Sequence, residues 1–206
     1  MCRWARPQGN LFPGPPAPMP KPEDRRLLLA GLLVSLLPAA GCRGAETTFE
    51  ETTMPLRVGD AAPVVTLHLQ DGRAVPLSEF RGDRAAVIFF YPKDNTPVCT
   101  AEACSFRDAY ADFGTLDAEV IGVSADSPAS HQKFSAKYNL PFPLASDTDG
   151  AIRRAFGVPK PLGFLPGRTT YVIDRGGTVR LVFSAAFAAE KHVTEARRVL
   201  AALAEE

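Results

Sequence analysis

Two cysteines, Cys99 and Cys104, are the residues of this chain whose type and spacing most clearly indicate chemistry. Cys99 follows Pro92 and Thr96, and the residues after it are good helix formers. We therefore expect Cys99 in the first turn of a helix, where unpaired backbone N–H groups and the helix dipole favour the ionised thiolate, the nucleophilic form of a cysteine. Thr96 can place a hydroxyl near this sulfur or near the group it attacks. Pro92 offers an apolar wall that limits the access of water.

The spacing of the two cysteines argues against a permanent disulfide. In an unbroken helix, residues five apart have Cα atoms roughly 8–9 Å apart, given a rise of about 1.5 Å and a turn of about 100° per residue. A disulfide requires about 4.4–6.8 Å between the same atoms. A bond between Cys99 and Cys104 therefore needs the start of the helix to unwind, which suits a switch that opens on oxidation better than a structural crosslink.

The elements around Cys99 follow the order strand, loop, helix. Residues 85–90 form an unbroken apolar run, Ala-Ala-Val-Ile-Phe-Phe, which is too short for a helix and typical of a strand buried on both faces of a sheet. Pro92 and Pro97 interrupt the loop that follows and prevent the helix from starting early. Beyond Cys99, apolar residues recur at helical spacing, at Phe106, Ala109, Tyr110 and Phe113.

The rest of the chain alternates strands and helices. Two hairpins are expected, one over residues 64–69 and 74–76 with a turn at Asp71-Gly72, the other over residues 169–174 and 178–183. The remaining elements are a buried strand over residues 119–124, a helix from Pro128 to about Tyr138, a short helix near residues 151–156 and an amphipathic helix over residues 191–203. This order predicts an α/β domain with a mixed sheet.

These residues resemble a known family. The pattern Pro92-x-x-x-Thr96-x-x-Cys99 matches the peroxiredoxin active-site motif, and a second cysteine five residues on is similar to the Q-type, bacterioferritin comigratory protein-like subgroup. The resemblance extends over roughly residues 56–203 and includes Gly59-Asp60-Ala61-Ala62-Pro63, Leu77-Ser78-Glu79-Phe80-Arg81-Gly82, Ile121-Gly122-Val123-Ser124 and Arg168-x-x-Tyr171-Val172-Ile173-Asp174. Val98 is a departure, since glycine is common there in this subgroup, but it removes no chemical group.

The resemblance implies a thioredoxin-like fold, in which a central mixed sheet with an N-terminal β-hairpin is flanked by helices. It also implies a thioredoxin-dependent peroxidase. Cys99 would be the peroxidatic cysteine, Cys104 the resolving cysteine that forms an intramolecular disulfide with it, and Arg168 the arginine that supports the thiolate and the peroxide. The substrates would be hydrogen peroxide and alkyl hydroperoxides, and the reductant thioredoxin or a thioredoxin-like protein. No metal, flavin or haem cofactor is implied, and similarity to Q-type relatives favours a monomer.

The N-terminal part has a different composition from the rest. Residues 7–22 are rich in proline, and Arg25-Arg26 precede a short apolar run over residues 27–37 that is followed by Ala39-Ala40-Gly41-Cys42. Charge, a short apolar core and small residues are typical of a secretory signal. The core is about half of the roughly 20 residues that a spanning helix needs.

These features predict a signal peptide over residues 1–41, a tether over residues 42–55 and a catalytic domain over residues 56–206. The end of the signal resembles a bacterial lipobox, in which Cys42 is acylated. We therefore expect a lipoprotein of the bacterial periplasm, held at the membrane through Cys42. Plain cleavage and a retained anchor are alternatives, and Met19 is an alternative start.

The composition excludes several other classes of protein. The chain has 206 residues, a formal net charge of +0 and 46% hydrophobic residues, which describes an ordinary globular protein of one domain. The chain has no excess of basic residues of the kind that would indicate binding to nucleic acid.

Three histidines, His68, His131 and His192, lack metal-ligand spacing and are expected at the surface. Glu102 is expected in the first helical turn, where its charge would oppose ionisation of a nearby thiol.

Two other functions are compatible with two cysteines in such a fold. A thiol–disulfide oxidoreductase shares the fold but normally uses Cys-x-x-Cys, and the spacing here is wider. A copper carrier could combine Cys99 and Cys104 with a distant histidine such as His192, since thiolates and imidazole suit copper. That second function would leave Thr96 and Pro92 without a role.

Overall fold

The computed structural model describes residues 54–205 except residues 81, 83 and 160–166. Within these residues, seven strands form one mixed sheet in the order β2-β1-β5-β4-β3-β6-β7. The strands are β1 (Thr66–Leu69), β2 (Ala74–Pro76), β3 (Ala85–Phe90), β4 (Ala118–Ser124), β5 (Leu144–Ser146), β6 (Thr169–Ile173) and β7 (Val179–Ser184). The predicted α/β class, with a mixed sheet and an N-terminal hairpin, is confirmed.

Strand β3 lies at the centre of the sheet and carries the loop that leads to Cys99. All six of its residues are buried, as its apolar run predicts. It pairs in parallel with β4, where Phe90 lies opposite Val123, and antiparallel with β6, where Phe90 lies opposite Thr169. The end of β3 is therefore next to the start of β6, and a residue just before β6 lies beside the loop that follows β3.

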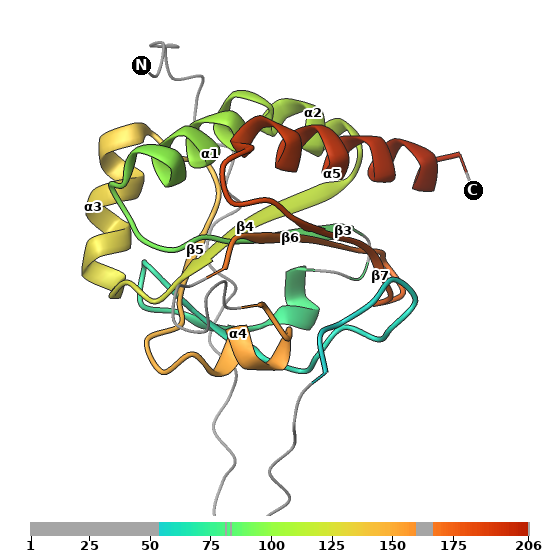
Figure 1. Cartoon of the computed structure of the whole chain (residues 1–206), viewed down its shortest axis with the longest axis horizontal. Helices are drawn as coiled ribbons and strands as arrows, with labels where there is room; N and C mark the ends of the chain where they lie inside the picture. The colour runs from blue at the N-terminus through green and yellow to red at the C-terminus, as the bar shows by residue number, and fades with distance from the viewer. Residues whose placement is uncertain (1–53, 81, 83, 160–166, 206) are drawn as a thin grey trace, which may run out of the picture. The chain divides into compact units, whose positions relative to one another are not determined.

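Helices cover both faces of the sheet (Figure 1). One face packs against α1 (Pro97–Asp108), α2 (Tyr110–Thr115), α3 (Pro128–Tyr138) and α5 (Ala189–Leu203). The other face packs against α4 (Ala151–Ala155) and the short 3-10 helix η1 (Leu77–Phe80). Strand β3 supplies both cores, because its successive side chains point to opposite faces. In the described part of the chain, none of these helices is both long and apolar enough to cross a membrane.

Helix α3 shows how closely the local sequence can define an element. It begins after Ser127, whose Oγ accepts the backbone N–H of Ser130 at 3.3 Å, and Pro128 occupies its first turn. It ends at Asn139, which adopts the left-handed conformation with φ 52°. A capping serine, an early proline and a left-handed asparagine are ordinary signals for the two ends of a helix. The predicted helix from Pro128 to about Tyr138 is confirmed.

Two elements differ from the expectation. The helix after Cys99 is divided into α1 and α2, because Ala109 leaves helical geometry with φ −97° and ψ 3°. Residues 144–146 form strand β5, which pairs in parallel with β4 and antiparallel with β1 and so joins the N-terminal hairpin to the central sheet. A strand of three residues is too short to show a period in the sequence.

Gly122 in β4 leaves no room for a side chain. A Cβ there would lie 2.7 Å from Cδ2 of Leu144 and 2.8 Å from Cζ of Phe89. We expect Gly122→Ala to lower the free energy of unfolding by about 1–3 kcal/mol, because the overpacked core must shift. Urea denaturation measures this loss. Gly114→Ala in α2 is the matched control: a Cβ there meets nothing within 4 Å, and alanine favours a helix, so stability should hold or rise. Equal stability of the two variants would contradict the prediction.

Candidate active site

Cys99 is in the first turn of α1, as predicted. Thr96 precedes the helix in an extended conformation, and Pro97 occupies its first position, where the missing N–H would have had no partner in any case. The first backbone hydrogen bond of the helix runs from Thr100 N–H to Thr96 O at 2.8 Å. Cys99 is only 2% exposed and is not part of a disulfide. Its sulfur is thus held in a closed site at the positive end of the helix dipole.

Arg168 reaches this sulfur from the other side of the site. It precedes β6 directly, and the pairing of β6 with β3 brings it beside the loop to α1. Its Nη2 donates a hydrogen bond to Sγ of Cys99 at 3.1 Å, and its Nε donates to the carbonyl of Ala186 at 3.1 Å. Arg168 is 6% exposed. A buried guanidinium that stays charged and donates to sulfur favours the thiolate over the thiol.

Glu102 binds the same guanidinium. Nη1 of Arg168 forms a short hydrogen bond and ion pair with Oε2 of Glu102, which is fully buried. Because α1 begins at Pro97, Glu102 lies in the second turn, and the prediction that it lies in the first turn is wrong. Burial raises the pKa of Glu102 to about 8, although the charge and the hydrogen bond of Arg168 oppose this rise. The sequence analysis considered Glu102 as a negative charge that could oppose ionisation of a nearby thiol. In the structure, the carboxyl of Glu102 is linked to the sulfur of Cys99 through the guanidinium of Arg168.

His192 closes the far side of the site, from α5. Its Nε2 donates to the carbonyl of Ala185 at 2.9 Å, and its Nδ1 lies 2.8 Å from Oγ1 of Thr170 and 3.6 Å from Oε1 of Glu102. Burial lowers the pKa of His192 below its ordinary value. The prediction of a surface position is wrong for His192 and for His131, which are both fully buried. A single histidine gives no periodic pattern in the sequence. Its hydrogen-bond partners in the interior come from other parts of the chain, so only the fold reveals that it is buried.

Cys104 lies in the same helix as Cys99 and is 5% exposed. The helix is continuous from Pro97 to Asp108, so both cysteines are on regular backbone. Cys99 is not in a disulfide, so the bond between Cys99 and Cys104 stays a prediction.

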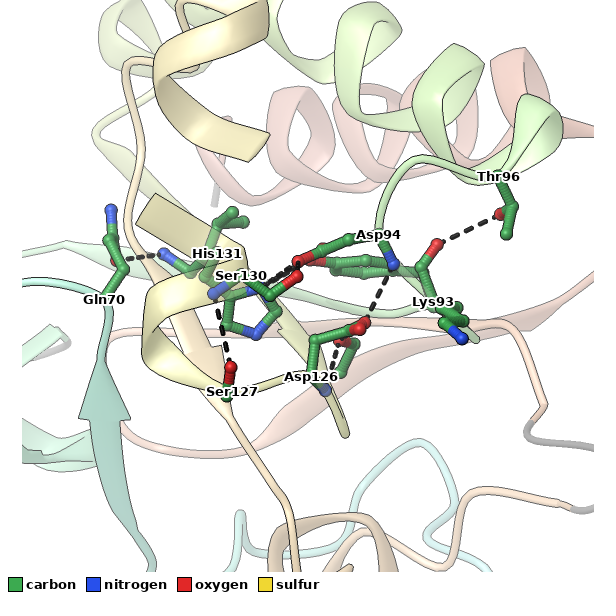
Figure 2. A network of polar contacts seen from close by, with 11 residues as sticks. Gln70, Lys93, Asp94, Thr96, Asp126, Ser127, Ser130 and His131 are labelled. Carbon is green, nitrogen blue, oxygen red and sulfur yellow. Dashed lines mark hydrogen bonds and ion pairs between the residues drawn. The ribbon is translucent and has the colours of Figure 1, made fainter. Parts of the chain in front are cut away.

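Thr96 and Pro92 line the approach to α1. The hydroxyl of Thr96 donates to the carbonyl of Lys93 at 3.0 Å (Figure 2), and it does not cap the helix through its side chain. Pro92 is half-buried in the same loop. Both residues lie in the loop before α1, and the hydroxyl of Thr96 is engaged by that loop. The predicted contacts of Thr96 and Pro92 with the sulfur of Cys99 stay a prediction.

A buried network around Asp94 holds this loop (Figure 2). The carboxylate accepts hydrogen bonds from Tyr91 Oη at 2.8 Å, from Ser130 Oγ at 2.7 Å and from His131 Nδ1 at 3.0 Å. The backbone N–H of Asp94 donates to Asp126 Oδ2 at 2.8 Å. The loop is thereby fastened to α3 and to the segment after β4, which fixes the start of α1.

The network predicts a stability change that depends on pH. Burial alone would raise the pKa of Asp94, but hydrogen bonds from His131, Ser130 and Tyr91 outweigh it and lower the pKa below its ordinary value. A carboxyl with such a lowered pKa stabilises the fold above its unfolded pKa, about 3.9, and this contribution is lost as the pH falls through the folded pKa. We expect Asp94→Asn to lower the free energy of unfolding by about 1.5–3 kcal/mol at pH 7 and by less below pH ~4.

Urea denaturation at several pH values measures this difference. Asp71→Asn is the matched control, because Asp71 lies in an exposed turn, and it should change stability by no more than about 0.5 kcal/mol at any pH. If Asp94→Asn cost the same at pH 3 and at pH 7, the carboxylate charge would not be what stabilises the loop.

Comparison with known proteins places the chain in a family. The model of the AhpC/TSA family matches residues 58–182. The putative chloroplastic peroxiredoxin Q of Oryza sativa subsp. indica is 51% identical over 146 residues, which cover 70% of this chain and 67% of that protein. The chain belongs to the peroxiredoxin family, in its Q-type group. It is therefore a thiol-dependent peroxidase, as the motif around Cys99 predicts.

Further relatives agree with this assignment. The chloroplastic peroxiredoxin Q of Sedum lineare is 45% identical over 167 residues, which cover 76% of this chain and 89% of that protein. The crystal structure of peroxidoxin BcpB from Mycobacterium tuberculosis superposes with a TM-score of 0.67 and 37% identity, over 73% of this chain and 98% of that one. A solved structure of peroxiredoxin Q from Xanthomonas campestris gives a TM-score of 0.62 and 35% identity, over 75% of this chain and 99% of that one. The predicted thioredoxin-like peroxiredoxin fold is confirmed.

The location predicted for this peroxiredoxin is wrong. Relatives from Oryza sativa, Sedum lineare and Arabidopsis thaliana are named as chloroplastic proteins, which contradicts the prediction of a membrane-anchored lipoprotein of the bacterial periplasm. Basic residues before a short apolar run can form a targeting signal that a receptor recognises. The physical chemistry of such residues alone does not define the compartment. The predicted signal peptide, Cys42 and all of the tether except its last two residues lie outside the described residues. The whole of residues 1–55 lies outside the matched segment.

The two alternative functions find no support in this peroxiredoxin. A thiol–disulfide oxidoreductase would not need the residues that surround Cys99. A copper site with His192 is disfavoured because both of its ring nitrogens already bind other groups, Thr170 and Ala185. Across residues 54–205, apart from those not described, no three His, Cys, Asp or Glu side chains are grouped so that they could hold a metal ion.

Proposed function

We propose that Cys99 is the peroxidatic cysteine of this peroxidase and that Arg168 stabilises its thiolate. The observation that supports this assignment is the 3.1 Å hydrogen bond from Nη2 of Arg168 to Sγ of Cys99, made where both residues are buried. The guanidinium charge and the N-terminus of α1 both favour the anionic sulfur. The substrates are hydrogen peroxide and alkyl hydroperoxides.

In the first step, the thiolate of Cys99 attacks one peroxide oxygen. The S–O bond forms as the O–O bond breaks, the sulfur loses two electrons to the peroxide, and the departing oxygen leaves as water or an alcohol once it has taken up a proton. Arg168 is placed to stabilise the charge that develops on this oxygen, because its Nη2 already points at the site of attack.

Thr96 and Pro92 contribute to this step through the loop. We infer that the hydroxyl of Thr96 turns from the carbonyl of Lys93 to the bound peroxide, which competes for the same donor. Pro92 has no N–H to offer and limits the access of water to the sulfur. Both roles follow from their place before the first turn of α1.

In the second step, Cys104 attacks the sulfenic acid of Cys99, and a disulfide forms with the loss of water. The regular backbone from Pro97 to Asp108 must first unwind, because the bond does not fit a helix at this spacing. A thioredoxin-type protein then reduces the disulfide by thiol exchange. Because both cysteines belong to one helix, one chain suffices for the cycle, and we expect a monomer.

Mass spectrometry of the protein after one equivalent of peroxide tests this assignment. The expected product is lighter by two hydrogens, and its peptide map joins the peptide of Cys99 to the peptide of Cys104. A stable oxygen adduct on Cys99, with Cys104 unchanged, would remove the resolving role. Consumption of peroxide with both cysteines unchanged would remove the assignment altogether.

A further inference from the structure

One guanidinium in this site serves two acidic groups. Arg168 donates through Nη2 to Sγ of Cys99 and through Nη1 to Oε2 of Glu102. Cys99 is 2% exposed and Glu102 is 0% exposed, so water does not screen either group. If both acids were ionised, two buried negative charges would share one positive charge, and an unpaired buried charge is costly. The geometry therefore favours a state in which one of the two acids keeps its proton.

The surroundings of Oε1 indicate which acid keeps it. Within the described residues this oxygen has no hydrogen-bond partner, and the polar atom that faces it is Nδ1 of His192 at 3.6 Å. The carbonyl of Ala185 can only accept, so Nε2 of His192 carries the hydrogen in their 2.9 Å bond. In the neutral ring, Nδ1 then holds a lone pair, which accepts from Thr170 Oγ1. Nδ1 therefore offers Oε1 no hydrogen, and its partial negative charge repels a carboxylate oxygen more than a neutral carboxylic acid.

The charged and titratable groups that face Glu102 agree with this. They are Arg168 from the segment before β6, His192 from α5 and, through Arg168, Cys99 from α1 itself. Burial raises the pKa of Glu102 to about 8, and burial lowers the pKa of His192. Ordinary glutamic acids ionise at about pH 4.3, so this environment favours a carboxyl that keeps its proton at neutral pH.

We propose that Glu102 keeps its proton while Cys99 is a thiolate and gives the proton up when the sulfur is oxidised. The proposal rests on the assignment of Cys99 as the peroxidatic cysteine. In the balanced step, the thiolate of Cys99 and the carboxylic acid of Glu102 react with ROOH. The products are the sulfenic acid of Cys99, the carboxylate of Glu102 and ROH. The S–O bond forms and the O–O bond breaks, and the proton that Glu102 releases balances the one that the departing oxygen takes up. Once the sulfur is neutral, Arg168 pairs with Glu102 alone, and the site again holds one negative and one positive charge.

Proton uptake per peroxide tests the proposal. The experiment uses Cys104→Ser, which stops at the sulfenic acid, in weak buffer at pH 7 with a pH indicator and a limiting amount of hydrogen peroxide. The variant that also carries Glu102→Gln should take up one proton more per peroxide than Cys104→Ser alone, because it has no internal proton to release. Equal uptake in the two variants would overturn the proposal. Comparing the two variants cancels any ionisation of the sulfenic acid itself.

Glu119 supplies a matched control for this experiment. It is a part-buried glutamate that accepts a hydrogen bond from Tyr110 Oη at 3.0 Å, and burial is the main cause that raises its pKa. Unlike Glu102, it lies on β4 and has no contact with Arg168. In the Cys104→Ser background, Glu119→Gln should leave the proton uptake unchanged. An extra proton taken up by this variant would show that the count does not report on Glu102.

Infrared spectroscopy tests the same proton without any peroxide. The reduced protein at pH 7 should show a carboxylic acid carbonyl band that Glu102→Gln removes, and addition of peroxide to Cys104→Ser should abolish this band. A carboxylate at Glu102 in the reduced protein would contradict the proposal. The infrared band of the reduced protein is measured without turnover, so it reports on the protonation of Glu102 whatever the role of Cys99. An error in the role of Cys99 and an error in the protonation of Glu102 therefore give different results.

Discussion

Cys99→Ser should reduce the rate of peroxide consumption to that of a protein-free control. A serine hydroxyl does not ionise near neutral pH, so neither the Arg168 guanidinium nor the N-terminus of α1 can produce the nucleophile that the first step requires. The substitution changes one atom in a side chain that is 2% exposed, and we expect the fold to persist. The measurement is the disappearance of hydrogen peroxide in the presence of a thioredoxin-type reductant.

Cys104→Ser is the matched control for this prediction. It should consume one equivalent of peroxide at close to the normal rate, because Cys99 and its contact with Arg168 are unchanged. Turnover with a thioredoxin-type reductant should then stop, since no disulfide forms for it to attack. Sustained turnover by Cys99→Ser would refute the peroxidatic role of Cys99. A normal steady state in Cys104→Ser would refute only the role of Cys104.

Much of the fold could be predicted from the sequence, because its elements have local signals. Strand β3 is an unbroken apolar run, α3 has a serine and a proline at its start, and each hairpin has a glycine in its turn. The elements that escaped prediction lack such signals. Strand β5 has three residues, and the break at Ala109 interrupts a stretch in which the apolar spacing continues.

The site was predicted only in part, because its remaining contacts join distant parts of the chain. The motif around Cys99 is local, and the resemblance added Arg168 from beyond it. Glu102 and His192, however, meet only because α1 and α5 pack on the same face of the sheet. Asp94 and His131 are 37 residues apart in the sequence and bind each other across two elements. Neither pair has a spacing that a sequence pattern can reveal.

The prediction of the compartment failed for another reason. Residues that pack in a core obey periodicities set by backbone geometry, so their pattern can be interpreted physically. A targeting segment obeys the specificity of its receptor, and a similar order of basic, apolar and small residues can serve more than one purpose. Packing arguments therefore apply to residues 54–205 far better than to the segment that precedes them.

Arg168→Met should lower the second-order rate constant for hydrogen peroxide by about 10²–10³-fold, the usual effect of removing one donor from a developing negative charge. Methionine has a similar length and stays buried, but it donates nothing to Cys99 or to the departing oxygen. The variant should also lose about 1–3 kcal/mol of stability at pH 7, because the buried carboxyl of Glu102 loses its partner. Stopped-flow kinetics and urea denaturation measure the two effects.

A double variant separates the two effects of Arg168. In Arg168→Met with Glu102→Leu, both members of this buried polar pair are replaced by apolar side chains, a change that is often neutral for stability. We expect urea denaturation to return close to that of the unchanged protein, while the rate constant for peroxide stays as low as in Arg168→Met. If activity recovered together with stability, Arg168 would act by holding Glu102 and the fold in place. If stability recovered alone, its effect on the rate would come from its charge and its hydrogen bond at the sulfur of Cys99.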